Sequence, residues 1–265
     1  MTVGELLALS PGTDAAHLIA ARLNLSRAQI LAFPERDVPA EQATSLSQEL
    51  AELTAGKPLA YLLGYRDFWD IRLQVSPHVL IPRPETELLV ETVLKHAPVG
   101  AKVLDLGTGS GCIALALANT RSDLQITGAD LSGEALKVAK KNAQNLGLAD
   151  VNFIESNWFD SISGEWDFVV ANPPYIAPDD PHLIDLTDEP RSALVAANEG
   201  LEDLAHIVNT ALSRLAPNGR LALEHGYNQG DAVRAMMTSS NYTSVTTVQD
   251  LAGLDRVTTG IKLSP

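Results

Sequence analysis

The sequence predicts an α/β protein in which an open parallel sheet, covered by helices on both faces, follows a small helical domain. Over residues 1–65, apolar residues recur at helical spacing, as at Leu46, Leu50 and Leu53. From residue 101 onward, apolar strand-like runs alternate with helical segments. This alternation is typical of βα units whose parallel strands are buried on both faces.

The composition is that of an ordinary globular protein. The chain has 265 residues, of which 45% are hydrophobic, enough for one large domain or a large one plus a small one. We expect neither a transmembrane helix nor a signal peptide, because no run of 18 apolar residues occurs and no basic region precedes the first apolar stretch. The single cysteine, Cys112, excludes an internal disulfide and fits a reducing cytoplasm.

The net charge of −14 limits the partners that the protein can bind. A protein that holds duplex DNA needs basic surface to replace the phosphate counterions, so we expect no direct DNA binding. Acidity can also simply aid solubility, or suit a basic protein partner. A monomer is the default expectation, and no metal site is predicted.

The chain divides into three segments. Residues 1–65 are predicted to form several short helices, because prolines interrupt the helical pattern. Residues 66–84 are predicted to form a hairpin or an extended linker, because "DIRLQVS" alternates apolar and polar residues and the stretch "SPHVLIPRPE" is rich in proline. Residues 85–265 form the predicted sheet domain, which opens with a helix over 85–94.

The later strands and helices of the sheet domain are each predicted from the spacing of their apolar residues. The predicted strands cover 102–107, 124–130, 151–156, 167–172, 219–226, 244–250 and 256–263. The predicted helices cover 110–119, 132–147, 201–215 and 230–239. Ser132 suits the N-cap of its helix, and Gly147 suits the end of the same helix.

A glycine-rich loop follows the first of these strands, in "VLDLGTGSGCIALALA". Its glycines permit a tight turn and let a ligand lie against bare backbone at a helix N-terminus. The spacing is G-x-G-x-G, whereas dinucleotide enzymes have G-x-G-x-x-G. In addition, Asp105 would oppose a pyrophosphate dianion. A carboxylate there suits a ligand with ammonium and sulfonium charges, which indicates S-adenosylmethionine. The predicted cofactor-binding residues of the loop are Asp105, Gly107, Thr108, Gly109, Ser110 and Gly111. The alternative is a plain turn between strand and helix.

Three further cofactor contacts are predicted at the ends of the next two strands. Asp130 can accept hydrogen bonds from both ribose hydroxyls, which would serve a dinucleotide equally well. Trp158 can pack on an adenine ring, and Asn157 can hydrogen-bond near its edge. The alternatives are a core tryptophan and a turn asparagine.

The fourth strand ends in "NPPYIAP", where Asn172, Pro173, Pro174 and Tyr175 form a stiff arch. Residues before a proline are extended, and neither proline has an N–H. The Asn172 side-chain oxygen and the Pro173 carbonyl are therefore two acceptors aimed at one point, with the flat face of Tyr175 beside them. A planar –NH2 group needs such acceptors, because binding both hydrogens turns the nitrogen lone pair toward an incoming methyl group. The alternatives are a rigid turn or a proline-rich binding motif.

At these residues the chain resembles the amino-group branch of the class I S-adenosylmethionine-dependent methyltransferases. Other stretches, among them "GKPLAYLLGYRDFW", "IPRPETELLVE", "EPRSALVAANEGL" and "LALEHGYNQG", look like the release factor glutamine methyltransferase family over essentially the whole chain. The resemblance implies a Rossmann-like class I methyltransferase sheet with a small N-terminal helical domain joined by a β-hairpin linker. It also implies methyl transfer to the glutamine amide of the Gly-Gly-Gln loop of bacterial release factors, with the helical domain recognising the substrate.

The resemblance implies roles for specific residues. Asn172, Pro173 and Tyr175 would be catalytic, and Asn172 would also touch the cofactor. The implied substrate-binding residues are Asn172, Pro173, Pro174, Tyr175, Arg83 and Glu87. Arg83, Glu85 and Glu87 can instead simply favour the start of a helix, with Pro84 at its first position. Glu224 and His225 end the fifth strand on the ligand side. They are candidates for contacting the residues that bind the ligands, and not the ligands themselves.

Three alternatives stay open. Ribosomal-protein glutamine methyltransferases share Asn-Pro-Pro-Tyr. A DNA amino methyltransferase would flip out its base and would need a basic groove, which a charge of −14 opposes. A non-catalytic binding module could keep the cofactor fold.

Overall fold

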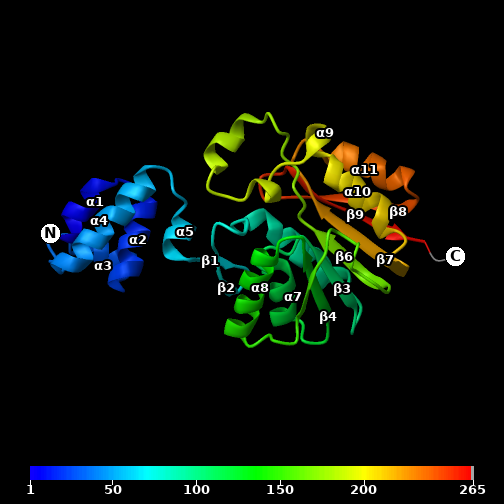
Figure 1. The fold of residues 1–265 in the computed structure, drawn as a ribbon, viewed down its shortest axis with the longest axis horizontal. Helices are drawn as coiled ribbons and strands as arrows, with labels where there is room; N and C mark the ends of the chain where they lie inside the picture. The colour runs from blue at the N-terminus through cyan, green and yellow to red at the C-terminus, as the bar shows by residue number, and fades with distance from the viewer. Residues whose placement is uncertain (264–265) are drawn as a thin grey trace. The chain divides into compact units, whose positions relative to one another are not determined.

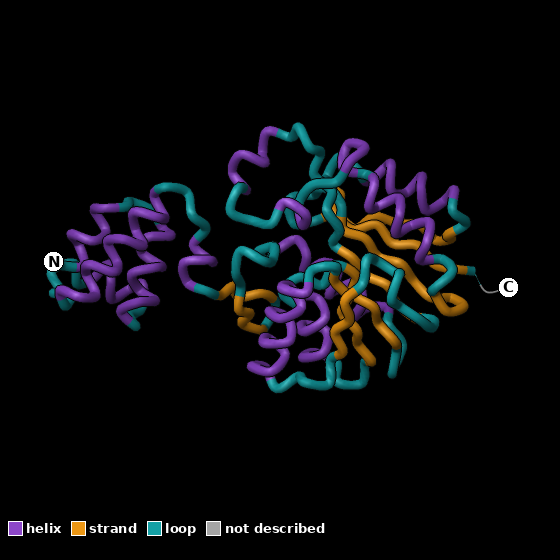
Figure 2. The backbone as a smooth tube through the Cα atoms, viewed as in Figure 1, coloured by secondary structure: helices purple, strands orange, loops and turns teal. Residues whose placement is uncertain are grey.

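The computed structural model describes residues 1–263. The chain forms two compact units, one of residues 1–65 and one that begins at Arg66. Figures 1 and 2 show the helical first unit and the second unit, in which a sheet is layered with helices.

The first unit is helical, as predicted. Its helices are α1 (Val3–Leu9), α2 (Thr13–Leu23), α3 (Arg27–Ala32), α4 (Ala40–Thr54) and α5 (Leu59–Leu63). Side chains satisfy the free N–H groups at two helix starts, since Thr2 caps α1 and Ser26 caps α3. The predicted stripe of α4 faces the core, with Leu46 and Leu50 buried and Leu53 packed against them. Each helix is short, and the shared apolar core is what stabilises it.

The second unit opens with the predicted hairpin, β1 (Tyr65–Phe68) and β2 (Ile71–Gln74). Its main sheet has the strand order β5-β4-β3-β6-β7-β9-β8. The strands are β3 (Lys102–Leu106), β4 (Gln125–Asp130), β5 (Asn152–Glu155), β6 (Trp166–Ala171), β7 (Leu215–Glu224), β8 (Tyr242–Gln249) and β9 (Asp255–Lys262).

The predicted open parallel sheet is present, and it departs from parallel pairing only at one edge. Strands β3 to β7 pair in parallel, but β9 runs antiparallel to β7, and β8 runs antiparallel to β9. Only residues 250–254 separate β8 from β9. A parallel connection needs a crossover of roughly a dozen residues or more, so two strands joined by so short a turn must be antiparallel.

Helices cover both faces of the sheet (Figure 1). Those that pack against it are α6 (Glu87–His96), α7 (Cys112–Thr120), α8 (Gly133–Leu146), α10 (Glu202–Ala211) and α11 (Gly230–Ser239). The shorter helices of this unit are η1 (Pro84–Thr86), η2 (Pro181–Leu186), η3 (Arg191–Ala193) and α9 (Ala197–Gly200). As predicted, the Ser132 side chain caps α8, and Gly147 ends it in the left-handed conformation. No helix within residues 1–263 has the length and apolar character needed to cross a membrane.

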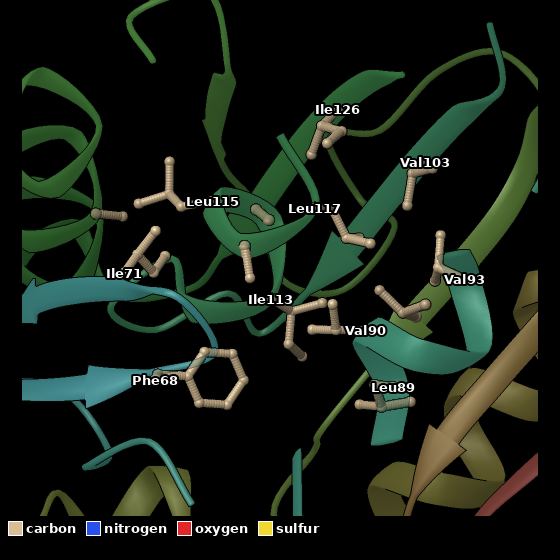
Figure 3. Close-up of a cluster of buried hydrophobic side chains, with 14 of the residues drawn as sticks. Phe68, Ile71, Leu89, Val90, Val93, Val103, Ile113, Leu115, Leu117 and Ile126 are labelled. Carbon is tan, nitrogen blue, oxygen red and sulfur yellow. The ribbon is translucent and has the colours of Figure 1, made fainter. Parts of the chain in front are cut away.

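Alternating strand residues divide the core into two clusters. Val103, Phe168 and Val170 pack with α6, α7 and α8, whereas Leu104 and Val169 pack with α10 and α11. Figure 3 shows the first cluster, where side chains of α6 and α7 meet those of the hairpin. Both faces of the parallel strands are therefore buried. A ligand site is expected at the carboxyl ends of these strands, in the loops that follow them.

Candidate active site

A cavity of about 500 Å³ lies at the carboxyl ends of the parallel strands. The loops after β3, β4, β5 and β6 line it, together with segments 77–80 and 190–195. The predicted site residues among its lining are Gly107, Gly109, Asp130, Asn157, Trp158, Asn172 and Pro174. Its size suits a small organic ligand, for which clefts of roughly 300–1,000 Å³ are usual.

The glycine loop has backbone geometry that explains its glycines. Gly107, Gly109 and Gly111 have φ values of 69°, 55° and 83°, in the left-handed region. A Cβ on Gly107 would lie 3.6 Å from Cζ3 of Trp158, in the space between the loop and the indole. A Cβ on Gly111 would lie 2.9 Å from Cδ1 of Leu115, so this glycine permits close packing at the start of α7.

Asp105 lies behind the glycine loop and is completely buried. Its Oδ2 accepts hydrogen bonds from the Thr108 hydroxyl at 2.6 Å and from the Ala114 N–H at 3.2 Å. Its Oδ1 has no hydrogen-bond partner in the described part of the chain. Burial raises the pKa of this carboxyl to about 7. Asp105 does not line the cavity, but its unpartnered Oδ1 is a buried acceptor behind the glycine loop, which fits a cationic ligand. Direct contact between Asp105 and the cofactor stays a prediction.

Asp130 ends β4 and lines the cavity. Its Oδ2 accepts the Gly109 N–H and its Oδ1 accepts the Ser132 N–H, each at 2.8 Å. Burial raises the pKa of the carboxyl, although both backbone hydrogen bonds lower it. Each oxygen keeps lone pairs for a further donor, so the geometry is compatible with the predicted ribose contact.

Trp158 and Asn157 also line the cavity, and the Trp158 indole lies beside the glycine loop at Gly107. Trp158 has a φ of 46°, a conformation that bulky residues adopt rarely. Burial raises the pKa of Asp203, and a hydrogen bond with the Trp158 side chain lowers it. Asn157 donates to Asp160 at 3.3 Å. Asp203 also lines the cavity, and it was missed from the sequence because two adjacent acidic residues in the first turn of a helix, as in α10, are common without any ligand.

The Asn-Pro-Pro-Tyr arch is fixed at both ends by residues distant in the chain. Asn172 Nδ2 donates to Oγ1 of Thr86 at 3.1 Å, and the Tyr175 hydroxyl donates to Oε1 of Glu224 at 3.2 Å. Burial and the nearby Glu224 carboxyl raise the pKa of Tyr175. The prediction that Glu224 supports the site is consistent with these contacts, whereas the role of Thr86 was missed.

Gln229 fixes the backbone that follows the arch. Its Nε2 donates to the carbonyl oxygens of Tyr175 and Glu199, at 3.0 and 3.1 Å. Its Oε1 accepts the Gly226 N–H at 2.9 Å. One buried amide therefore connects three loops, which no local pattern in the sequence indicates.

Arg83 and Glu87 lie outside the cavity lining, and both have partners within the protein. Arg83 forms an ion pair with Glu189, whose side chain is only 2% exposed. Glu189 also accepts the Ile81 N–H at 2.9 Å, so it connects the two segments that cover the cavity. Glu87 accepts the Trp69 N–H at 2.8 Å in the hairpin turn. Substrate contact by Arg83 and Glu87 stays a prediction.

Glu224 gives the cofactor-free protein a specific pH dependence. Burial raises its pKa from 4.5 to about 7, so between these values the folded protein holds a proton that the unfolded chain has released. Unfolding then releases a proton, and the free energy of unfolding is expected to fall as the pH rises through this window and to level off above it. At about 1.4 kcal/mol per pKa unit, the fall in the free energy of unfolding that this group causes is roughly 3.5 kcal/mol. Urea unfolding across the window checks this, with Glu224→Gln expected to show a shallower fall. Equal slopes in the two proteins would contradict it.

Comparison with known proteins identifies the family. The model of the "Methyltransferase small domain" matches residues 84–239, and that of the "PrmC N-terminal domain" matches residues 6–64. A release factor glutamine methyltransferase of Salmonella typhimurium is 46% identical over 95% of this chain and 92% of its own. The Escherichia coli protein of the same name is 42% identical, with the same coverage of both chains.

A solved structure supports the fold independently. The crystal structure of a methyltransferase from Pyrococcus furiosus matches with a TM-score of 0.58 at 16% identity, covering 82% of this chain and 100% of that one. The predicted fold, enzyme class and cofactor, S-adenosylmethionine, are thus confirmed. With 42–46% identity to such relatives over 95% of its length, the chain belongs to the release factor glutamine methyltransferase family.

Proposed function

We propose that this chain transfers a methyl group from S-adenosylmethionine to the side-chain amide nitrogen of the glutamine in the Gly-Gly-Gln motif of peptide chain release factors. One observation supports this above the others. Asn172 uses its Nδ2 to bind Thr86, so its Oδ1 is left as an acceptor on the arch that borders the cavity. The Pro173 carbonyl is the second acceptor, because no donor within the described residues 1–263 forms a hydrogen bond with it.

The residues around the cavity fit S-adenosylmethionine. When bound, this cofactor supplies an electrophilic methyl group on a positively charged sulfur. Gly107 and Gly109 offer bare backbone, Asp130 offers acceptors for the ribose, and Trp158 offers a flat face for the adenine. The unpartnered Oδ1 of Asp105 adds negative potential behind the loop.

The two acceptors of the arch activate the substrate amide. The lone pair of an amide nitrogen is delocalised, so the nitrogen is a poor nucleophile. Hydrogen bonds from both of its hydrogens to Asn172 Oδ1 and the Pro173 carbonyl turn the nitrogen and stabilise the positive charge that develops on it. Asn172 is not a general base, because a neutral amide cannot take up the proton. The proton leaves to solvent after the methyl group has been transferred.

The release factor is bound by more than the active site. The helical unit, residues 1–65, binds the body of the release factor, and residues 66–84 link it to the methyltransferase domain of residues 85–265. A net charge of −14 suits a basic protein partner and opposes direct DNA binding. The enzyme works as a monomer in the cytoplasm.

Mass spectrometry of a release factor incubated with the protein and S-adenosylmethionine tests this function. We expect one added methyl group on the glutamine of Gly-Gly-Gln, and none on a release factor in which that glutamine is replaced by glutamate. Plasmid DNA serves as the competing substrate. Methyl transfer to DNA, with none to the release factor, would overturn the proposal.

Asp130→Asn is expected to weaken binding of S-adenosylmethionine by about tenfold to a hundredfold. The carboxylate accepts two backbone N–H groups, and an amide would turn a donor toward one of them. A hydrogen bond to a charged group contributes about 1.5–3 kcal/mol. Calorimetric titration of the cofactor measures the effect. Asp123→Asn is the control, because Asp123 precedes the same strand at its other end. An equal affinity in both variants would contradict the assignment.

A further inference from the structure

Thr86 occupies a buried position between the arch and the end of β7. It is 2% exposed and directly precedes α6. Its Oγ1 accepts the Asn172 Nδ2–H, across 86 residues of chain. Hydrogen bonding with its hydroxyl lowers the pKa of Glu224, which burial raises. The hydroxyl therefore contacts the Asn172 amide and lies near Glu224, whose buried Oε2 has no hydrogen-bond partner in the described part of the chain.

The chemistry of a hydroxyl determines which way the Asn172 amide faces. A threonine hydroxyl has one proton to donate and lone pairs to accept. When its proton is directed to the Glu224 carboxylate, only lone pairs remain for Asn172. Asn172 must then present its –NH2 group to Thr86, and its Oδ1 faces the other way. An unconstrained amide has two orientations of similar shape, and the reversed one would place its own –NH2 group against the –NH2 group of the substrate.

We propose that Thr86 is a positioning residue, whose hydroxyl accepts the Asn172 Nδ2–H and donates to Glu224, and thereby keeps Asn172 Oδ1 directed at the substrate nitrogen. This rests on the acceptor role of Asn172 described above. Glu224 is the common anchor, because it also accepts the Tyr175 hydroxyl at 3.2 Å. One carboxyl at the end of β7 then holds Tyr175 directly and Asn172 through Thr86.

Removal of the hydroxyl without loss of side-chain volume tests this. Thr86→Val is expected to lower kcat on the order of tenfold to a hundredfold, because the reversed amide loses the orientation that the reaction needs. The Kd for S-adenosylmethionine and the KM for the release factor are expected to stay near wild type. Thr86→Ser, which restores the hydroxyl, is expected to recover most of the turnover. Thr92→Val is the matched control, since Thr92 is also buried, lies on α6, and donates its hydroxyl to the Leu88 carbonyl within the same helix.

The outcomes separate this inference from the proposed function. Wild-type turnover in Thr86→Val, alongside an inactive Asn172→Ala, would overturn the role of Thr86 and leave that of Asn172 intact. An equal loss in Thr86→Val and Thr92→Val would show a general effect of losing a buried hydroxyl, and would also overturn it. If Thr86→Val does not fold, Thr86→Ser and Thr86→Cys are compared. Sulfur is the weaker acceptor, so kcat is expected to be lower for cysteine, and equal kcat values would overturn the inference.

Discussion

Replacement of Asn172 by alanine is expected to lower turnover on the order of a hundredfold to a thousandfold, the cost of losing one preorganised hydrogen bond to a developing charge. The amide oxygen is one of only two acceptors assigned to the substrate –NH2 group. Without it the nitrogen lone pair stays delocalised into the amide carbonyl, and the positive charge that forms during methyl transfer loses one of its two stabilising hydrogen bonds. The affinity for S-adenosylmethionine is expected to stay near wild type, because the glycine loop and Asp130 remain.

Single-turnover methylation of a release factor measures turnover, and calorimetric titration measures the affinity for S-adenosylmethionine. Asn145→Ala is the control for removal of an amide, since Asn145 is exposed on α8. Wild-type turnover in Asn172→Ala would exclude the acceptor role. A parallel loss of cofactor affinity and turnover would instead assign Asn172 mainly to cofactor binding.

The parts of the site that sequence predicted are those encoded by neighbouring residues. The glycine loop, Asp130 and the Asn-Pro-Pro-Tyr arch each depend on residue types whose backbone behaviour is local, such as the φ of glycine or the missing N–H of proline. Because the loops after parallel strands meet at one edge of the sheet, these short motifs also predicted which residues would lie together.

The supporting contacts could not be predicted, because their partners are far apart in the chain. Thr86 lies 86 residues from Asn172, and Glu189 lies 108 residues from Ile81. A lone threonine or glutamate carries no periodic signal, and only the folded sheet brings these side chains together. The same holds for Asp105, because its position in the strand does not reveal that its side chain is buried behind the loop and not on the cavity wall.

Gly200 packs directly against the arch. Its φ is 79°, and a Cβ there would lie 2.0 Å from the Tyr175 carbonyl oxygen and 2.9 Å from Gln229 Nε2. These two atoms are hydrogen-bonded to each other, so neither can move alone. The preceding residues, Asn198 and Glu199, are also left-handed, with φ values of 52° and 57°. Because the turn is tightly packed, any side chain at position 200 must displace the backbone of the arch.

Gly200→Ala is therefore expected to cost about 4 kcal/mol or more of the free energy of unfolding, in the range reached only by severe core disruption. Turnover of the folded fraction should fall as well, because the Tyr175 backbone must shift. Gly147→Ala separates backbone strain from collision. Gly147 has a φ of 72° but no atom within 4 Å of its Cβ position, so this variant carries only the left-handed penalty of about 1–2 kcal/mol. Urea unfolding and methylation assays of both variants measure the difference. If the two substitutions cost the same, the turn at Gly200 can relax away from Tyr175, and the arch does not depend on this contact for its position.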